Sequence, residues 1–438
     1  MSFDAPAAQA ESALTLHMPL AGASRAKIFL YLGVLLVLLG FGWPGGGLIG
    51  LPISFFLKNK LHLKAHEVAT FQLISHIPVY LSFAFGFARD RFNPFGMRDR
   101  GFMVLFGAIA AGVYLFFAFT HPTYATLLTA VLLLMTSFLF ILSAQRGLTS
   151  TIGQQQLMSG QVSAAWNIFE GLPGFAALLA GGALSDLMEG RGADQAARML
   201  FLVGAAIATA IALFGLLKPA SVFDNVHSER LTGAHPWDDF KRLLKHWPIY
   251  PALLIWLLWN FAPGSITSLQ YYLQNTLHAK DAQWGQWNAI FGMSFVPTFL
   301  VFGFLCRRFP LKTLLFWGTV VAVPQMVPLV FIHSVTGALI AAAPIGLMGG
   351  VATAAYLDLI IRSAPKGLQG TVLMATVGFT SIDARFGDVL GTNLYDHFGG
   401  FTVCVIAITI VYALILPTLL LVPKRLIATA DGEAPLEG

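Results

Sequence analysis

Charged side chains are scarce in this chain. Only 11% of its 438 residues are Asp, Glu, Lys or Arg, whereas 56% are apolar. An ordinary soluble domain carries about 25% charged residues, so the composition excludes that class. With a mean hydropathy of +0.72, the chain is long enough for about a dozen spans of roughly 20 residues each. We therefore expect an all-α membrane protein.

Cysteine is also rare. Cys306 and Cys404 are the two present, and the expected topology places them near opposite faces of the membrane, which argues against a disulfide. Residues 1–26 contain neither a basic n-region nor an early apolar core, so no cleaved signal peptide is expected. The sequence contains no metal-ligand, phosphate-loop or nucleophile constellation. We predict no enzyme activity, no metal and no cofactor.

Twelve apolar segments can be recognised. They cover about 28–57, 67–88, 101–120, 125–146, 159–184, 198–218, 248–276, 285–306, 313–333, 338–362, 370–395 and 401–422. Lys and Arg are concentrated in the loops of one side, which marks that side as cytoplasmic in an inner-membrane protein. Both termini are expected there, as tails over 1–27 and 423–438. The net charge of +5 lies in these short loops and does not indicate nucleic-acid binding.

The longest polar stretch, 219–247, divides the segments into two groups of six, which predicts six-helix bundles over 28–218 and 248–422. Its second half has apolar residues at i, i+3 and i+4 spacing, namely Trp237, Phe240, Leu243, Leu244 and Trp247. This pattern is typical of an amphipathic helix on a membrane surface. A plain linker is the alternative.

The two groups of six resemble each other. The first segment ends in a Phe-Phe-Leu-Lys-Asn run up to His62, the seventh in a Tyr-Tyr-Leu-Gln-Asn run up to His278, and a Pro-Gly pair precedes each. The fifth and eleventh segments share three residues at one offset, Gly181, Leu184 and Asp186 matching Gly391, Leu394 and Asp396. Two matches in the same order indicate parallel repeats, related by an axis along the membrane normal.

The loop after the second segment contains a signature, made of Gly86, Asp90, Arg91, Gly96, Arg98 and Arg100. It resembles the G-x-x-x-D-(R/K)-x-x-x-x-G-(R/K)-(R/K) pattern of the major facilitator superfamily. That resemblance implies two pseudo-symmetric six-helix bundles and a gating role for these residues. Gly86 permits close helix approach, Asp90 is expected at the N-terminus of another helix, and the arginines are expected to pair across the inner gate. The equivalent loop after the eighth segment has Arg307 and Arg308 but no acid.

A second resemblance covers most of the chain and is strongest near 50–100 and 356–394. The run from Asp358 through Arg362, Pro365 and Gly367 to Gly370-Thr371 is similar to the folate-biopterin transporter family, which has a late acid in the tenth helix followed by Pro-x-Gly-x-Glu-Gly-Thr. Gln369 stands here where Glu is usual, and the acid pair of that family's fourth span is missing. The resemblance implies a pterin- or folate-like solute.

Charges lie inside two of the apolar segments, where charge is costly. Glu170 is near the centre of the fifth, and Asp383, Arg385 and Asp388 are near the centre of the eleventh. Arg385 and Asp388 can pair at i, i+3, whereas Asp383 points about 200° away from Arg385. Because a desolvated carboxylate can bind and release protons near neutral pH, we expect the three acids to include the proton-coupling group and Arg385 to attract an anion. A structural ion pair between Arg385 and an acid of another segment is the alternative.

Further candidates are polar or aromatic. Asp358 and Arg362 have i, i+4 spacing, which favours either a local pair or a gate latch. Arg146 is either a snorkelling anchor or a substrate-facing charge. Backbone groups freed at the two Pro-Gly breaks can bind solute, so the remaining substrate-binding candidates are Trp43, Asn260, Gln270 and Tyr271.

These patterns predict a monomeric secondary transporter that takes up a small anionic organic solute with protons, by alternating access. An exporter of drugs or metabolites with the same fold is one alternative. A non-transporting membrane receptor or scaffold is another.

Overall fold

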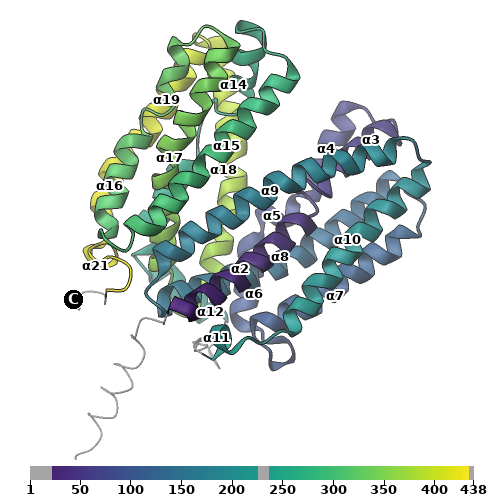
Figure 1. Cartoon of the computed structure of the whole chain (residues 1–438), viewed down its shortest axis with the longest axis horizontal. Helices are drawn as coiled ribbons and strands as arrows, with labels where there is room; N and C mark the ends of the chain where they lie inside the picture. The colour runs from purple at the N-terminus through teal and green to yellow at the C-terminus, as the bar shows by residue number, and fades with distance from the viewer. Residues whose placement is uncertain (1–21, 225–235, 434–438) are drawn as a thin grey trace, which may run out of the picture.

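Every described element of the chain is a helix. A computed structural model describes residues 22–224 and 236–433, and no strand occurs in those ranges (Figure 1). The first half contains α2 (Gly22–Gly42), α3 (Gly50–Asn59), α4 (Ala65–Ser75), α5 (Ile77–Tyr80), α6 (Ser82–Arg91), α7 (Asp99–Ala118), α8 (Tyr124–Gln155), α9 (Ser159–Glu189) and α10 (Ala193–Leu216). The second half contains α13 (Ile249–Asn260), α14 (Thr267–Tyr271), α15 (Asp281–Leu305), α16 (Leu311–Ala322), α17 (Val335–Ser363), α18 (Gln369–His397), α19 (Phe401–Ala413) and α20 (Ile415–Thr418). Three short helices lie outside the spans, namely α11 (Ala220–Phe223), α12 (Pro236–Lys245) and α21 (Lys424–Ile427).

Nine of the helices within the described ranges are long and apolar enough to cross a membrane. The other three expected spans are broken or charged. The second is divided into α4, α5 and α6, the seventh into α13 and α14, and the eleventh is the charged helix α18. The predicted twelve spans in two six-helix bundles are confirmed. Helices suit a bilayer because they satisfy their own backbone hydrogen bonds.

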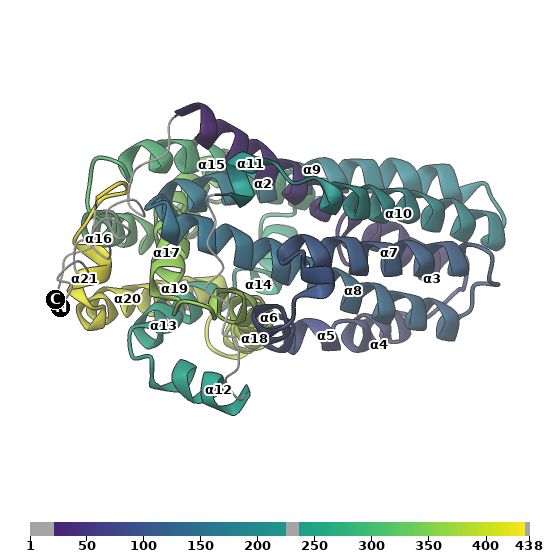
Figure 2. The same ribbon diagram turned by 90° about the horizontal axis from the view of Figure 1, so that it is seen from below.

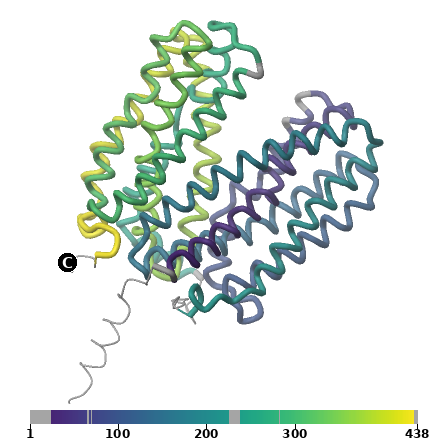
Figure 3. The backbone as a smooth tube through the Cα atoms, viewed as in Figure 1, coloured from purple at the N-terminus to yellow at the C-terminus, as the bar shows by residue number. Residues whose placement is uncertain are grey.

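The two bundles meet at one end and diverge toward the other (Figure 1), and the same division is visible along the backbone trace (Figure 3). We call the end that carries α12, α21 and the start of α9 the closed end, and the end that carries α3 and α14 the open end. Two seams join the bundles. At one, α18 packs against α6 and α8, and at the other, α9 packs against α15 and α17.

The segments outside the spans differ in part from the sequence prediction. Helix α2 begins at Gly22, so the first span starts before the expected boundary at residue 28; residues 1–21 of the predicted tail lie outside the described ranges. The predicted amphipathic helix is present as α12 and stands apart from the bundles (Figure 2). Residues 225–235 of that linker also lie outside the described ranges. Residues 424–433 were expected to be tail, yet they contain α21 and a buried Asp431.

The repeat inferred from the sequence extends to backbone detail. His62 and His278 both adopt positive φ, at 53° and 61°. In each half the next helix then starts with a capping box, where the side chain at the third helical position accepts a hydrogen bond from the backbone N–H of the capping residue. The two pairs are Glu67 with Lys64 at 2.7 Å and Gln283 with Lys280 at 2.8 Å. Two unrelated halves would not share this connector.

Glycines let the fifth and eleventh spans pack directly on the broken first and seventh spans. A Cβ added at Gly181 of α9 would lie 1.9 Å from the carbonyl oxygen of Gly47. A Cβ added at the repeat-equivalent Gly391 of α18 would lie 2.1 Å from the backbone nitrogen of Gly264, which itself has a φ of +91°. Helix backbones approach this closely only when both partners lack side chains.

We expect Gly181→Ala to destabilise the protein by about 1–3 kcal/mol, because the added methyl group meets backbone that cannot move aside. The neighbouring Gly182→Ala is the matched control, since no atom lies within 4 Å of the added carbon. Thermal unfolding in detergent can be followed with a thiol-reactive dye, because Cys306 and Cys404 are both free and buried. Equal melting temperatures for the two variants would contradict the packing described above.

Candidate functional site

A polar cavity of about 320 Å³ lies where the first span is broken. Its walls come from residues 44–57 of that span, from α4 and the adjoining His76, from two positions of α8 and from one position of α9. Among its described lining residues, only Arg385 of α18 belongs to the second half. The cavity therefore combines backbone freed by a helix break with a cation from the opposite bundle.

Arg385 forms no hydrogen bond or ion pair with any residue in the described ranges, and its side chain is exposed. The expected pair with Asp388 is not formed. Asp388 instead accepts hydrogen bonds from the backbone N–H of Thr267 at 2.9 Å and from its hydroxyl at 2.7 Å. Thr267 starts α14 after the Pro-Gly break, and the N–H groups of a new helix need an acceptor. The structural pair between Arg385 and an acid of another span is also not formed.

The sequence reasoning missed four polar residues of this cavity, one of which is Ser54 of α3 and three of which lie around the end of α4. Gln72, Ser75 and His76 lie at the end of α4, where the second span changes direction. The imidazole Nδ1 of His76 is 2.7 Å from the carbonyl oxygen of Gln72, which orients the ring. The available signal was a polar run placed two residues before Pro78, inside an otherwise apolar segment.

The candidates at the two Pro-Gly breaks lie in different bundles. Trp43 packs edge-on against Phe138, and its indole Nε1 borders Gly45 of the cavity wall. Asn260 donates a hydrogen bond to the carbonyl oxygen of Trp256, within its own helix. The remaining pair, Gln270 and Tyr271, lies beyond the second break and contacts Gln274 and Tyr395 respectively. The structure brings Trp43 to the cavity but places the other three in the second half, away from it.

Arg146 lies in a cluster with two residues of α9. Its guanidinium stacks over the Trp166 ring at 4.6 Å and is 3.5 Å from a carboxylate oxygen of Glu170. The Trp166 indole donates a 2.8 Å hydrogen bond to the other carboxylate oxygen. The Arg146 side chain is 13% exposed, so the snorkelling-anchor interpretation is wrong: the charge is paired inside the protein. Glu170 holds this pair while its own side chain stays 58% exposed.

Asp383 has a different environment. Its Oδ2 atom is buried and has no hydrogen-bond partner among the described residues. It lies two positions from Arg385 on α18 and so points to another side of the helix. A buried carboxylate oxygen without a donor is unfavourable when charged and becomes acceptable when protonated.

Asp90 lies at the N-terminus of α18, as expected for the signature loop. Its carboxylate accepts hydrogen bonds from the backbone N–H groups of Gly370 at 3.1 Å and Thr371 at 2.7 Å, and from the Thr371 hydroxyl at 2.7 Å. Gly86 permits this approach, because a Cβ there would lie 2.3 Å from the Gly370 carbonyl oxygen. Arg89 also pairs with Asp90, at 2.8 Å.

Two further arginines of the signature have partners in the linker helix and in the first bundle. Arg91 forms an ion pair with Asp239 of α12. Arg100 donates to the carbonyl oxygens of Gly215 and Leu216 at the end of α10, which have no partner within their helix. The expectation that Arg100 pairs across the gate is therefore wrong.

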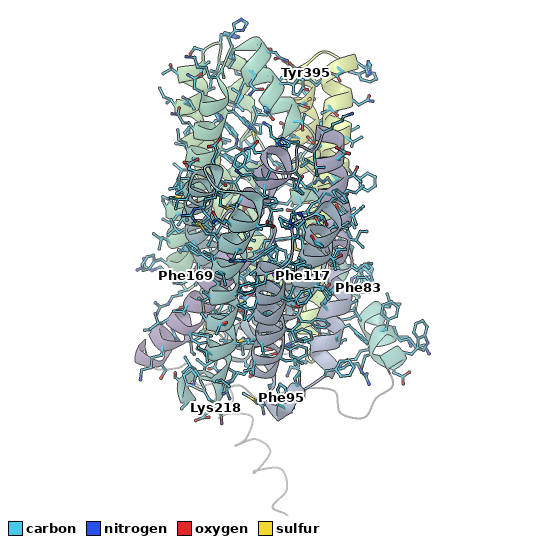
Figure 4. The ribbon with its side chains drawn as sticks, turned by 90° about the vertical axis from the view of Figure 1, so that its right-hand side faces the viewer. Phe83, Phe95, Phe117, Phe169, Lys218 and Tyr395 are labelled. Atoms are coloured by element: carbon cyan, nitrogen blue, oxygen red, sulfur yellow. The ribbon has the colours of Figure 1, made fainter. Side chains whose placement is uncertain are left out.

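The rest of the signature forms the turn between α6 and α7. Gly96 has a φ of +68°, which glycine adopts without strain. The Arg98 backbone N–H donates to the Asn93 side chain at 2.6 Å. Phe95 marks this turn at the foot of the molecule in Figure 4.

Asp358 and Arg362 form the expected local pair at 2.8 Å, and Arg362 has a second acidic partner, Asp431, at 2.9 Å. The Asp431 carboxylate also accepts hydrogen bonds from the backbone N–H groups of Gly160 and Gln161, at 3.2 and 2.9 Å. Burial raises the pKa of Asp431 to about 6; the Asp358 carboxylate adds to this effect and Arg362 opposes it. Sequence reasoning missed Asp431, because nothing in the final polar stretch indicates that it folds back between the bundles.

A second cavity, of about 1140 Å³, lies beside α12 and is bounded by α6 and α18. Phe83, which faces the detached α12 at the lower right of Figure 4, is one of its many apolar lining residues. Its hydroxyl groups at Ser82 and Thr371 are already bonded, to the Met374 carbonyl oxygen and to Asp90. This cavity offers mainly apolar contact, and its described lining residues include no Lys, Arg or His that would attract an anion.

Comparisons with known proteins agree with this architecture. Residues 158–382 match the family model described as Major Facilitator Superfamily. The human organic anion transporter MFSD10 (TETRAN) is similar with a TM-score of 0.63 at 15% identity, covering 91% of this chain and 100% of that one. FucP in the outward conformation gives 0.65 at 14% identity over 88% and 97%. A second structure of the E. coli fucose:proton symporter FucP gives 0.61 at 13% over 90% and 98%. No curated protein matches the chain.

We expect Asp388→Asn to leave stability nearly unchanged and Asp388→Ala to lower it by about 0.5–2 kcal/mol, because alanine removes the acceptor at the start of α14 whereas asparagine retains one. Asp396→Ala on the same helix is the control, since that residue is exposed. The melting temperature in detergent is the measurement. An Asn variant as unstable as the Ala variant would show that charge, and not capping, is what Asp388 supplies.

Proposed function

Because the chain belongs to the Major Facilitator Superfamily, we propose that it takes up a small anionic organic solute together with protons, by alternating access of one cavity to the two sides of the membrane. The superfamily consists of transporters and not of enzymes. The fold provides the two rigid bundles that such a cycle requires. The substrate and coupling parts of the proposal come from the site.

The observation that carries the proposal is the unpaired Arg385 beside a polar cavity. A guanidinium at membrane depth is costly without a counter-charge, and within the described residues Arg385 has none. An anionic solute in the cavity would supply it, with a bidentate geometry if the anion is a carboxylate. Gln72, Ser75 and His76 line the same cavity and offer additional hydrogen bonds. The family resemblance makes pterin- and folate-like carboxylates the first solutes to test.

The direction of access follows from charge and shape together. The closed end carries the arginine-rich loops, which the positive-inside rule assigns to the cytoplasm of the inner membrane. The diverging ends of the bundles then face outward, which is the state that receives solute for uptake. Both termini are cytoplasmic in this arrangement.

Asp383 supports the proton-coupling part. Its buried Oδ2 has no donor among the described residues, and it sits on the same helix as Arg385. Binding a proton there removes a charge from α18 during the change between states. Glu170 is the second candidate, since releasing its proton would be linked to its pairing with Arg146.

We expect Arg385→Gln to raise the KM for uptake of the anion by roughly ten- to hundredfold, the loss expected for a charged hydrogen bond. Arg385→Lys should retain part of the affinity, since it keeps the charge but loses the bidentate geometry. The measurement is uptake of radiolabelled pterin and folate carboxylates into proteoliposomes, with Arg198→Gln as a control outside the cavity. No flux for any solute in the wild type would favour a receptor or scaffold.

A second prediction concerns coupling. An inward proton gradient is expected to accelerate uptake by the wild type, and Asp383→Asn should abolish that acceleration while solute exchange without a gradient continues. Asp388→Asn is the matched control on the same helix, because its carboxylate is engaged with Thr267. If both Asp383→Asn and Glu170→Gln keep the gradient response, the proton-coupling assignment is wrong. If an inward proton gradient instead accelerates efflux of the solute from the proteoliposomes, the protein is an exporter that exchanges solute for protons.

A further inference from the structure

The second half of this chain has no acidic residue at the position that corresponds to Asp90 of the first half. In the first half, Asp90 at the end of the second span caps the N-terminus of α18. Lys64 and Lys280 are equivalent residues of the two repeats, since each caps the helix that follows the connector. If the halves are aligned on these two lysines, Cys306 falls at the position of Asp90. If the halves are aligned on the equivalent glycines Gly181 and Gly391, Gly160 of α9 falls at the position of Gly370. The eighth span should therefore cap α9, but it has a thiol where the carboxylate is needed.

The packing around Gly370 and Gly160 agrees with this alignment. A Cβ added at Gly370 would lie 2.7 Å from an Asp90 carboxylate oxygen, and one added at Gly160 would lie 2.7 Å from the Cβ of Cys306. Cys306 thus occupies the same place relative to α9 as Asp90 does relative to α18. The buried N–H groups at the start of α9 would be left without an acceptor, which is unfavourable.

Asp431 supplies that acceptor from a different part of the chain. Its own backbone N–H donates to the carbonyl oxygen of Cys306 at 2.8 Å, and its carboxylate accepts from Gly160 and Gln161. The next residue, Gly432, donates to the carbonyl oxygen of Leu157 at 2.7 Å. The segment is therefore bonded to the second bundle through α15 and to the first bundle through α9.

The pairing arginines are also equivalent in chemistry. In the first half Arg89 bridges two acids, Asp90 at 2.8 Å and Asp99 at 2.6 Å. In the second half Arg362 bridges Asp358 and Asp431, at 2.8 and 2.9 Å. The N-termini of α18 and α9 thus each face a buried carboxylate that is held by an arginine.

We propose that Asp431 is the gating carboxylate of the second half, replacing the acid that its own loop has lost. Separation of the bundles at the closed end then requires residues 429–432 to leave α9, and Asp431 is a positioning residue that stabilises the outward-facing state. This inference rests on the alternating-access cycle proposed above. Its test measures distances without any solute, so its failure and a failure to find a substrate are distinguishable.

The experiment measures the separation of the bundles at the closed end by pulsed electron–electron double resonance in lipid nanodiscs. Spin labels are attached at Phe92→Cys in the first bundle and Lys312→Cys in the second, in a Cys306→Ser, Cys404→Ser background. We expect Asp431→Ala to increase the ratio of separated to closed molecules by about tenfold or more, the effect of losing charged hydrogen bonds. Asp431→Asn, which keeps the shape of the side chain, should increase the same ratio by a smaller factor. It replaces the Ala variant in the test if that variant folds poorly.

Restoring the acid at its repeat position gives the decisive comparison. Cys306→Asp, which takes the place of Cys306→Ser in the spin-labelled Asp431→Ala protein, is expected to return the distance distribution to that of the closed state. Glu433→Ala is the matched control in the same segment, because that side chain bonds to the Ala430 backbone, and it should leave the distribution unchanged. An unchanged distribution for both Asp431 variants overturns the proposal, and so does a failure of Cys306→Asp to restore closure.

Discussion

Two helix N-termini point into the interface between the bundles, and the carboxylates bound to them join the bundles at the closed end. The first N–H groups of α18 and of α9 are buried at the closed end and have no partner within their helices. Each pair is satisfied by one carboxylate from another element, Asp90 for α18 and Asp431 for α9. A carboxylate at a helix N-terminus gains from charge-assisted hydrogen bonds and from the helix dipole together. Separation of the bundles must transfer these groups to water, so charged hydrogen bonds help to hold the closed end together, beside neutral ones such as those from Gln154 to the carbonyl oxygens of Ile361 and Ala364.

The open end depends on this closure. Because α9 and α18 are fixed at their first turns, each extends along the inner side of its bundle as the bundles diverge (Figure 1). Each is supported further along by one glycine contact, Gly181 on Gly47 and Gly391 on Gly264. The same two helices then carry Glu170, Asp383 and Arg385 at intermediate depth. A symmetric scaffold thus presents an asymmetric set of charges, with the cation reaching from the second half toward a cavity of the first.

The sequence anticipated more of the scaffold than of the site. The repeat, the signature loop and the position of Asp90 at a helix N-terminus could be predicted because each depends on local spacing or on a pattern with a known geometry. The partners of Arg146, Arg385 and Asp388 could not. Spacing along a helix permits Arg385 and Asp388 to pair. The Asp388 carboxylate instead accepts a hydrogen bond from the backbone N–H of Thr267, which lies on another element and has no partner within its own helix. His76 was missed for a similar reason, since a polar residue in a broken span has no meaning until its neighbours are known.

Hydropathy and the internal sequence repeat determined that this chain is a twelve-span helical membrane protein built from two parallel repeats. They suffice because a bilayer admits few backbone solutions and because hydropathy records the length of each span directly. Only the tertiary structure decided which charges are paired, which cavity Arg385 borders, and that Asp431 folds back between the bundles. Such contacts join residues far apart in sequence, and their free energy depends on burial and geometry that appear only once the helices are packed together.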